Sequence, residues 1–162
     1  MKKILLLSDT HSYIDERIVK YATEADEIWH AGDIGDMKVA QQLEKIKPFR
    51  AVHGNIDTKD HYPLNNIFVV EGVKVVITHI GGYPGKYTSR VKNLLKQESP
   101  KLYICGHSHI LKVMHDKTLK ILHMNPGAAG NSGFHQMRTM LRFQVENGKI
   151  DNLEVIELGK RG

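Results

Sequence analysis

Polar side chains that could bind a metal ion follow the first apolar run of the sequence. Residues 4–7 are Ile-Leu-Leu-Leu, and Ser8, Asp9, Thr10 and His11 come directly after them. A carboxylate oxygen from Asp9 and an imidazole nitrogen from His11 can turn toward a single point, and such a pair suits a divalent metal ion. Taken alone, the pair is more typical of a solvated turn. Its interpretation as a metal site therefore depends on the rest of the chain.

The same pattern recurs along the chain, because further short apolar runs also end in an aspartate, an asparagine or a histidine. Any one of these could be a capping or core residue, but seven at successive strand ends indicate one shared site. Carboxylate, amide and imidazole ligands without a thiolate suit Mn, Fe, Zn, Ni or Co. Seven ligands are too many for one ion, but they serve two ions if one carboxylate bridges. The candidate ligands are Asp9, His11, Asp33, Asn55, His79, His107 and His109.

The first third of the chain alternates between strand and helix patterns. Ser12 is expected to cap a helix, with Asp15 three residues after the cap. Asp36 is expected to start a second helix, which Pro48 stops. Three such units predict parallel strands with right-handed connections, so that all the strand ends lie on one edge of the sheet. The expected strands are residues 4–8, 27–31 and 49–53.

The pattern changes from residue 66 onward. Two apolar strands flank Gly72 as a hairpin, and a later pair of strands flanks Asn147-Gly148. The sequence therefore predicts an α/β protein with two sheets packed face to face and helices outside, in a single domain of residues 1–162. The remaining expected elements are strands at 66–71, 73–78, 101–105, 112–116, 119–124, 138–145 and 150–156, and a helix near 88–97.

The composition narrows the class of protein. No apolar run is long enough for a membrane helix, and the first apolar run is too short for a signal peptide. The single cysteine, Cys105, is expected to be a small buried side chain and agrees with a reducing compartment, so we expect a cytoplasmic protein. The net charge of +5 permits anionic substrates, but it is spread along the chain and does not predict nucleic-acid binding.

The candidate ligands stand in a recognisable series of motifs. Asp9-x-His11, Gly32-Asp33, Gly54-Asn55, His79 and Gly106-His107-x-His109, in this order, resemble the calcineurin-like metallophosphoesterases. The short length and the Asn125-Pro126-Gly127 segment are similar to the small YfcE-type phosphodiesterase subfamily. The resemblance implies a four-layer α/β/β/α sandwich. It also implies one metal held by Asp9, His11, Asp33 and His109, and another held by Asp33, Asn55, His79 and His107.

The resemblance further implies a metal-dependent phosphoric ester hydrolase, with Asp33, Asn55 and His107 as catalytic residues. Two metal ions make a bridging water acidic and clamp the phosphoryl oxygens, so that hydroxide attacks phosphorus in line. Manganese is the first choice, and Ni, Zn, Fe and Co are alternatives. We expect a small-molecule phosphodiester as substrate, no membrane association and no nucleic-acid partner, and a homodimer is left open.

Two positions depart from the family pattern. Many members have histidine directly after the asparagine, where this chain has Ile56, which cannot protonate a leaving group. Small members commonly read His-Gly-His where this chain has His79 followed by Ile80 and Gly81. His53 and His30 are candidate replacements for the missing imidazole, although His30 lies within a strand and is expected to be a core histidine.

Alternatives and weaker candidates remain open at this point. A phosphomonoesterase is the nearest enzymatic alternative and ranks below a phosphodiesterase because of Ile56. A metal-poor protein-binding scaffold like the retromer subunit of eukaryotes is an alternative of a different class, and a nuclease is a third possibility. Residues 80–88 fit either a lid or a plain connection. Specificity is expected in loops 56–66, 80–88 and 127–137. Side chains that could guide or contact an anionic substrate, or line the site, are Lys86, Arg90, Lys92, Lys96, Asn125, Gly127 and Arg138.

Overall fold

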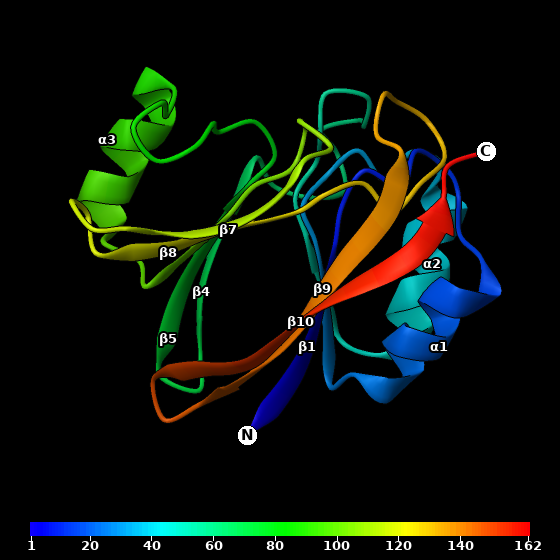
Figure 1. Cartoon of the computed structure of the whole chain (residues 1–162), viewed down its shortest axis with the longest axis horizontal. Helices are drawn as coiled ribbons and strands as arrows, with labels where there is room; N and C mark the ends of the chain where they lie inside the picture. The colour runs from blue at the N-terminus through cyan, green and yellow to red at the C-terminus, as the bar shows by residue number, and fades with distance from the viewer.

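The computed structural model describes residues 1–162 as ten strands and three helices (Figure 1). Five strands form the first sheet, in the order β10-β9-β1-β2-β3. β1, β2 and β3 are parallel, and the antiparallel pair of β9 and β10 extends the sheet on the other side of β1. The bounds are β1 Lys2–Leu7, β2 Glu27–His30, β3 Phe49–Ala51, β9 Met137–Glu146 and β10 Lys149–Lys160.

The other five strands form a second mixed sheet, in the order β4-β5-β6-β8-β7. β5, β6 and β8 are parallel neighbours, whereas β4 and β7 are antiparallel edge strands. The parallel strands of this sheet also deliver their following loops to one edge. The bounds are β4 Asn65–Val70, β5 Val73–Thr78, β6 Leu102–Ile104, β7 Leu111–Asp116 and β8 Ile121–Pro126.

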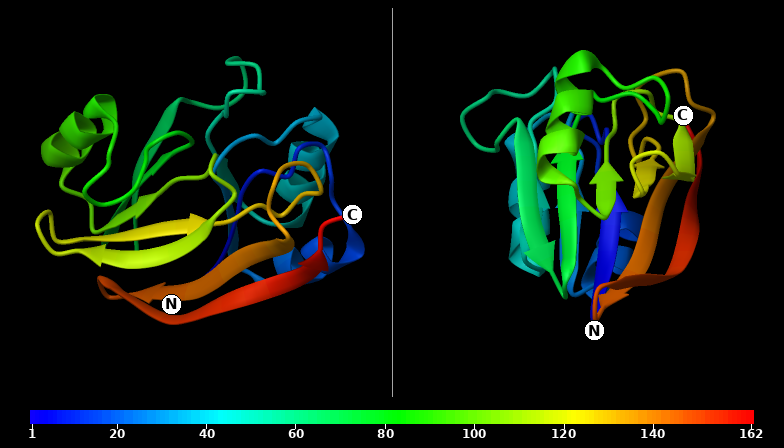
Figure 2. Two further views of the ribbon diagram at one scale, coloured as in Figure 1. Left: turned by 45° about the horizontal axis from the view of Figure 1, so that its top comes forward. Right: turned by 90° about the vertical axis from the view of Figure 1, so that its left-hand side faces the viewer.

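The two sheets pack face to face, and helices cover both outer faces (Figures 1 and 2). Trp29 from the first sheet meets Phe143 of the same sheet and Phe68 of the second sheet edge to face between them. Helices α1 (Glu16–Glu24) and α2 (Met37–Ile46) bury their apolar faces on the first sheet, and α3 (Ser89–Glu98) buries its apolar face on the second. The predicted four-layer α/β/β/α fold is thereby confirmed. None of the three helices is long and apolar enough to cross a membrane.

The expected start of the first helix is wrong by one turn. Asp15, not Ser12, is the cap, because the Asp15 carboxylate accepts the backbone N–H of Ile18. Ser12 has a left-handed backbone conformation, and its hydroxyl instead accepts the N–H of Asp36 at the start of the second helix. Ser12 therefore joins two loops at the strand ends.

Most of the remaining element boundaries are close to those expected, but β10 continues to Lys160, four residues beyond its expected end. β3 ends at Ala51 rather than at residue 53, and the β7–β8 pair lies one or two residues away from its expected place. Both hairpin turns are where the sequence predicts them, since Glu71-Gly72 and Asn147-Gly148 have the two successive positive φ angles of a tight hairpin turn. The sequence did not show that the last hairpin would join β1 in the first sheet.

One core histidine couples stability to pH. His123 on β8 is fully buried, and neither of its ring nitrogens has a hydrogen-bond partner. Its ring packs against Tyr83 and Tyr103, with centroid distances of 5.6 and 5.3 Å. Burial lowers the pKa of His123 to about 4, from 6.5 in the unfolded chain. The folded protein therefore resists a proton that the unfolded chain accepts.

We expect the free energy of unfolding to fall as the pH drops from 6.5 toward 4, by about 1.4 kcal/mol per pH unit for each such histidine. The His123→Phe variant keeps the aromatic contacts and removes the titrating ring, so its stability should depend less steeply on pH. Urea unfolding across this pH range measures the slope. His115→Gln, at an exposed position of β7, is the control. An unchanged slope in His123→Phe would contradict the assignment.

Candidate metal centre

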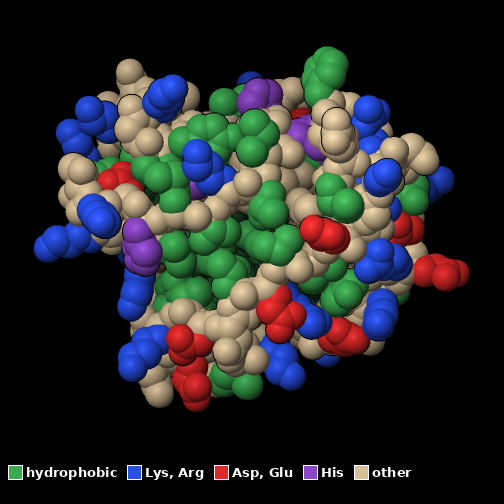
Figure 3. All heavy atoms as spheres, in the orientation of Figure 1, with side chains coloured by type: hydrophobic (Ala, Val, Ile, Leu, Met, Phe, Trp, Pro, Cys, Tyr) green, Lys and Arg blue, Asp and Glu red, His purple; other side chains and the backbone are tan.

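All seven predicted ligands lie in loops that follow the carboxyl ends of β1, β2, β3, β5 and β6. These loops meet along the upper edge of the molecule in Figure 1, and histidine side chains reach the surface at this edge in Figure 3. Backbone hydrogen bonds hold the loops in register: the N–H of Asp9 donates to the carbonyl of Gly32, and the N–H of Gly106 donates to that of His79. The site is thus built where the ends of both sheets meet.

Asp9, His11 and His109 form the first group of potential ligands. The distances from Asp9 Oδ1 are 3.2 Å to His109 Nε2 and 3.7 Å to His11 Nε2. The other oxygen of Asp9 accepts hydrogen bonds from the Ser8 hydroxyl at 2.6 Å and from the backbone N–H of His107 at 3.2 Å. These two bonds fix the carboxylate so that Oδ1 faces the two rings.

Asp33, His79 and His107 form the second group, and Asn55 completes it. His79 Nε2 lies 3.3 Å from Asp33 Oδ2. The side-chain oxygen of Asn55 lies 3.1 Å from both His79 Nε2 and His107 Nδ1. An amide oxygen that faces two imidazole nitrogens is the orientation that a cation requires, whereas a rotated amide would donate its N–H groups to Asp33 and to both rings instead.

Asp33 contacts both groups. Its Oδ2 lies 3.4 Å from His11 Nε2 on one side and 3.3 Å from His79 Nε2 on the other. Its Oδ1 accepts the backbone N–H of Ile56 at 3.1 Å. A single carboxylate is therefore held between two sets of imidazole ligands, as a bridging ligand must be.

The donor atoms are arranged for divalent cations, and they would repel one another without such a charge between them. Asp9 Oδ1 and His11 Nε2 are buried without a hydrogen-bond partner. His79 Nδ1 lies 2.7 Å from the carbonyl oxygen of Ala31. A carbonyl oxygen can only accept, so Nδ1 carries the proton in the neutral ring and the lone pair of Nε2 faces the Asp33 carboxylate. Lone pairs that converge in this way repel each other unless positive charge lies among them.

The backbone of the site is strained. Left-handed φ angles cost a non-glycine residue about 1–2 kcal/mol, and they persist only where the surrounding structure imposes them. Their concentration in these loops turns the side chains inward together and is typical of functional sites. The predicted ligands with φ between 45° and 70° are Asp9, His11, Asp33, His107 and His109.

The glycines of the motifs are required by close packing. A Cβ on Gly32 would overlap the ring of His79, and one on Gly106 would overlap Ser8 Oγ and Asp9 Oδ2. Glycine at these positions lets a neighbouring ligand approach the backbone directly. Close packing therefore explains why these motifs have a glycine directly before the ligand.

The electrostatics of the loops favour ionised carboxylates. Burial raises the pKa of Asp9, but the neighbouring imidazoles of His109 and His11 outweigh burial and hold this pKa below its usual value. Burial likewise raises the pKa of Asp33, and His79 more than offsets it. In turn, the nearby Asp9 carboxylate raises the pKa of His11. Both aspartates are therefore anionic near neutral pH.

His30 is the core histidine that the sequence predicts, beneath the site. Its Nδ1 accepts the N–H of Gly32 at 3.1 Å, so its Nε2 donates to Thr10 Oγ1 at 3.0 Å. Thr10 donates onward to the carbonyl of Ile34 at 2.9 Å. Burial lowers the pKa of His30 to about 4, so the ring is neutral and holds two loops together. The other candidate, His53, donates from Nδ1 to the carbonyl of Tyr62 and lies beside Asn55 in the wall of a pocket.

Sequence reasoning missed His135, in the loop between β8 and β9. Its Nε2 lies 2.8 Å from the carbonyl oxygen of Gly130. Because that oxygen can only accept, Nε2 carries the proton and Nδ1 is an acceptor. Nδ1 lies 3.2 Å from His109 Nδ1, so His109 donates to it and keeps its own Nε2 lone pair toward Asp9. No apolar strand precedes His135, so the pattern that revealed the other residues gave no signal for it.

We expect His135→Ala to weaken retention of the metal by about 10- to 100-fold, because His109 loses the acceptor that fixes its ring. His135→Asn should restore most of the affinity, since its side-chain oxygen can replace Nδ1 as the acceptor. Equilibrium dialysis against Mn²⁺ measures the effect. Gln136→Ala, an exposed neighbour, is the control. Equal affinity in His135→Ala and the wild type would contradict this role.

The expectation that Arg138 contacts an anionic substrate is wrong, because Arg138 is not a free cation. The guanidinium is buried, with Nη2 3.0 Å from Asp15 and Nε donating to the carbonyl of Ala129. Its charge is neutralised by Asp15, and its donors join β9 to the start of α1 and to the loop after β8. A phosphate contact by Arg138 would require these bonds to break.

Asn125 also has a structural role. Its amide nitrogen donates to the carbonyl of Gly106 and to Ser108 Oγ, each at 3.1 Å, and thereby supports the loop that carries His107 and His109. Tyr83 lies in residues 80–88, which fit either a lid or a plain connection. Its hydroxyl donates to the same Ser108 hydroxyl at 2.6 Å. Cys105 is buried as expected.

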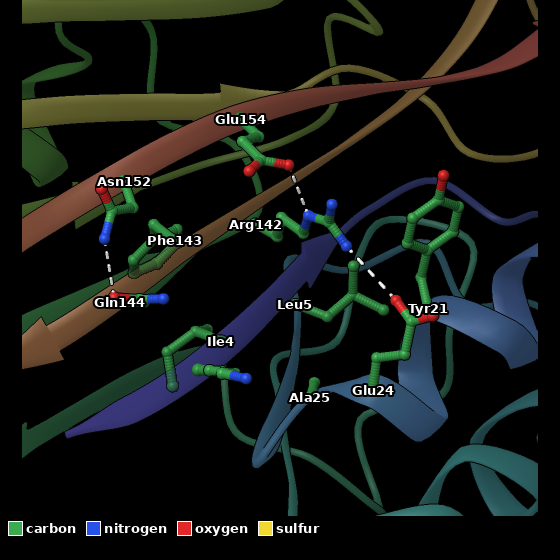
Figure 4. A pocket seen from close by; sticks show the side chains of 11 residues that line it. Ile4, Leu5, Tyr21, Glu24, Ala25, Arg142, Phe143, Gln144, Asn152 and Glu154 are labelled. Carbon is green, nitrogen blue, oxygen red and sulfur yellow. Dashed lines mark hydrogen bonds and ion pairs between the residues drawn. The ribbon is translucent and has the colours of Figure 1, made fainter.

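The pocket with the largest volume among those described lies elsewhere, and most of its charged side chains are paired. A hollow of about 440 Å³ opens beside the first residues of β1, at the opposite end of that strand from Asp9 (Figure 4). Arg142 in its wall already pairs with Glu154 at 2.7 Å and with Glu24 at 3.3 Å, and Asn152 donates to Gln144. Of the charged side chains in the wall, only Lys3 has no salt-bridge partner, so the hollow offers a ligand little polar recognition.

The fold and the site together define a class of protein: an α/β/β/α sandwich with carboxylate, amide and imidazole groups at the meeting point of two sheets. The model of the calcineurin-like phosphoesterase superfamily domain matches residues 1–148. The chain belongs to this superfamily, as its motifs predict, and metal-dependent phosphoric ester hydrolysis is the activity that the family supports.

Individual relatives agree with this assignment. A protein of Methanothermobacter thermautotrophicus named a probable metallophosphoesterase is 27% identical over 95% of this chain and 91% of its own length. The structure of an archaeal phosphodiesterase has a TM-score of 0.77 at 20% identity and covers 96% of this chain and 99% of its own. Vps29 of Chaetomium thermophilum has a TM-score of 0.79 at 12% identity over the whole of both chains. These two structures support the fold alone.

Proposed function

We propose that this protein is a phosphodiesterase that uses two divalent metal ions. The observation that carries the proposal is the position of Asp33 Oδ2, within 3.4 Å of His11 Nε2 and 3.3 Å of His79 Nε2. One ion would be held by Asp9, His11, Asp33 and His109. The other would be held by Asp33, Asn55, His79 and His107.

When bound, two such ions supply an acidified water as nucleophile and a positive clamp for the phosphoryl oxygens. The residues of the chain prepare this chemistry. The carbonyl of Ala31 fixes the tautomer of His79, and His135 fixes that of His109. Ser8 holds the Asp9 carboxylate in one orientation. The ligands are therefore placed before the substrate arrives, which lowers the reorganisation that the reaction requires.

The surroundings of Asn55 favour substrates with a good leaving group. Ile56 directs its backbone N–H to Asp33, and its exposed side chain has no proton to give. A leaving group that departs as a stable anion does not need such a proton, whereas an alkoxide does. A phosphomonoesterase is the nearest enzymatic alternative.

We also propose a metal, a substrate and a cellular location for this enzyme. The mixed oxygen and nitrogen ligands favour Mn²⁺, with Ni, Zn, Fe and Co as alternatives. We propose a small-molecule diester as substrate and the cytoplasm as location, in line with the single buried cysteine. A homodimer is compatible with this function.

The test is hydrolysis of bis(p-nitrophenyl) phosphate beside p-nitrophenyl phosphate by metal-stripped protein, titrated with Mn²⁺, Ni²⁺, Zn²⁺ or Mg²⁺. We expect metal-dependent cleavage that favours the diester and saturates at two ions per chain. Saturation at one ion would contradict the binuclear centre, and preference for the monoester would contradict the substrate class.

A protein-binding scaffold is the second candidate, because the fold is also that of the Vps29 structures. The complete set of seven ligand residues favours the enzyme. Folded protein that retains no metal and cleaves neither ester would favour the scaffold.

A further inference from the structure

A second pocket adjoins the candidate metal centre. It has a volume of about 390 Å³, and Asn55 and His79 of the second ligand group form part of its wall. The rest of the wall comes from the segment after β3 and from the start of α3, including Lys59, Leu64 and Arg90. This volume is within the range of sites that bind small molecules, roughly 300–1,000 Å³. A phosphate bound at the metal centre could extend one of its ester arms into this pocket, which we call the arm pocket.

The cations of the arm pocket lack anionic partners. Arg90 donates to Asn65 Oδ1 at 2.8 Å, to Thr78 Oγ1 at 2.8 Å and to the carbonyl of Ile80 at 3.3 Å. All three acceptors are neutral, so they orient the guanidinium without neutralising it. Lys59 forms no salt bridge with any carboxylate of the chain.

The one carboxylate in the wall does not neutralise these cations. Asp57 accepts the backbone N–H groups of Ile34, Gly35 and Gly54, at distances of 3.1, 2.9 and 2.8 Å. Its oxygens are directed at the loops that carry Asp33 and Asn55. With Lys59 and Arg90 unpaired, the arm pocket carries a positive balance that attracts anions.

The apolar part of the wall adds a second requirement. Leu64 and Ile80 are 47% and 41% exposed, and both line the pocket. They can cover the uncharged body of a ligand, while the cations meet a charged group on it. The wall contains no phenylalanine, tyrosine or tryptophan on which the successive bases of a strand could stack. A small amphipathic arm fits this wall better than a nucleic-acid strand.

We propose that the arm pocket selects substrates in which one ester arm carries a negative charge of its own, such as a second phosphate. The inference rests on the proposed function, because the scissile phosphate has to lie at the metal centre for an arm to reach Lys59 and Arg90. It names a substrate class for that site: small phosphodiesters with an additional anionic group.

The test compares two nucleotides as probes of the Mn²⁺-loaded protein by calorimetry. Thymidine 3′,5′-bisphosphate has a second phosphate that thymidine 5′-monophosphate lacks. We expect the bisphosphate to bind on the order of tenfold tighter, since each exposed charge pair contributes up to about fivefold. Lys59→Gln and Arg90→Gln should each reduce this ratio severalfold. The structure places Lys96 in the wall of a separate pocket beside Asp116, so the expectation that it guides the substrate does not hold for this pocket. Lys96→Gln therefore removes an equal charge from α3 without changing the wall of the arm pocket, and the ratio should be retained.

The outcomes separate this inference from the proposed function. Equal affinity for the two nucleotides, no binding of either, or a ratio that survives both substitutions would overturn the inference. Lys59 is exposed and forms no salt bridge, so Lys59→Gln should fold and decides the matter if Arg90→Gln misfolds. Metal-dependent cleavage of bis(p-nitrophenyl) phosphate is measured on the same preparation. Cleavage of the diester without tighter binding of the bisphosphate would overturn only the proposed role of the arm pocket. No cleavage would overturn the proposed function.

Discussion

Asp33→Asn should reduce diester hydrolysis by more than about 100-fold and weaken the binding of both metal ions, because Asp33 contacts both ligand groups. Asparagine has nearly the same shape, and its side-chain oxygen can still accept the N–H of Ile56. It lacks the negative charge that a bridging ligand provides. The fold should therefore persist while the centre fails.

Elemental analysis after gel filtration measures the number of bound ions, and hydrolysis of the chromogenic diester measures activity. Asp36→Asn is the matched control, because Asp36 is an exposed helix cap three residues away and asparagine caps helices equally well. Loss of a single ion with partial activity would show that Asp33 serves only one metal. Full activity in Asp33→Asn would exclude the bridging role.

Gly54→Ala should also abolish most of the activity, by more than about 100-fold, although residue 54 contributes no ligand atom. A Cβ at this position would lie closer than 3.0 Å to the Asp33 carboxylate and to its backbone nitrogen. Either the loop after β2 or the loop after β3 must then move. Overpacking of this kind costs about 1–3 kcal/mol of stability, so the variant should fold and lose metal.

Thermal unfolding and metal content, measured on the same sample, separate the two effects. Gly85→Ala is the comparison for a loss of stability without steric overlap, since its Cβ would meet nothing within 4 Å and its φ of +83° strains the backbone. If Gly54→Ala retains both ions and wild-type activity, the close approach of Gly54 to Asp33 is not required. If it fails to fold, Gly106→Ala offers the same test at Asp9.

The positions of the predicted ligands could be read from the sequence because the signal is local. An apolar run such as residues 4–7 predicts a buried strand, and parallel strands leave their next residues at one edge of a sheet. Asp33 and His79 follow such runs, so their types and places were apparent before their distances were known. The resemblance of the motif series then supplied their division between two ions.

Other features could not be predicted from the sequence, because they depend on contacts between residues far apart in the chain. The last hairpin could have joined either sheet, and its pairing with β1 is what buries Arg138 against Asp15. That burial turns a candidate phosphate contact into a structural ion pair. His135 follows no strand, so only the packing of its loop places it against His109.

Local sequence was thus enough to predict the alternation of strands and helices, the family, and which side chains stand at the strand ends, since each of these depends on neighbours along the chain. Only the packed structure places Asp33 between His11 and His79. The same holds for the contact of His135 with His109 and for the pocket that Lys59 and Arg90 share. Hydrogen bonds and charge balance act over short distances, so the close approach of these groups is fixed only when the two sheets pack together.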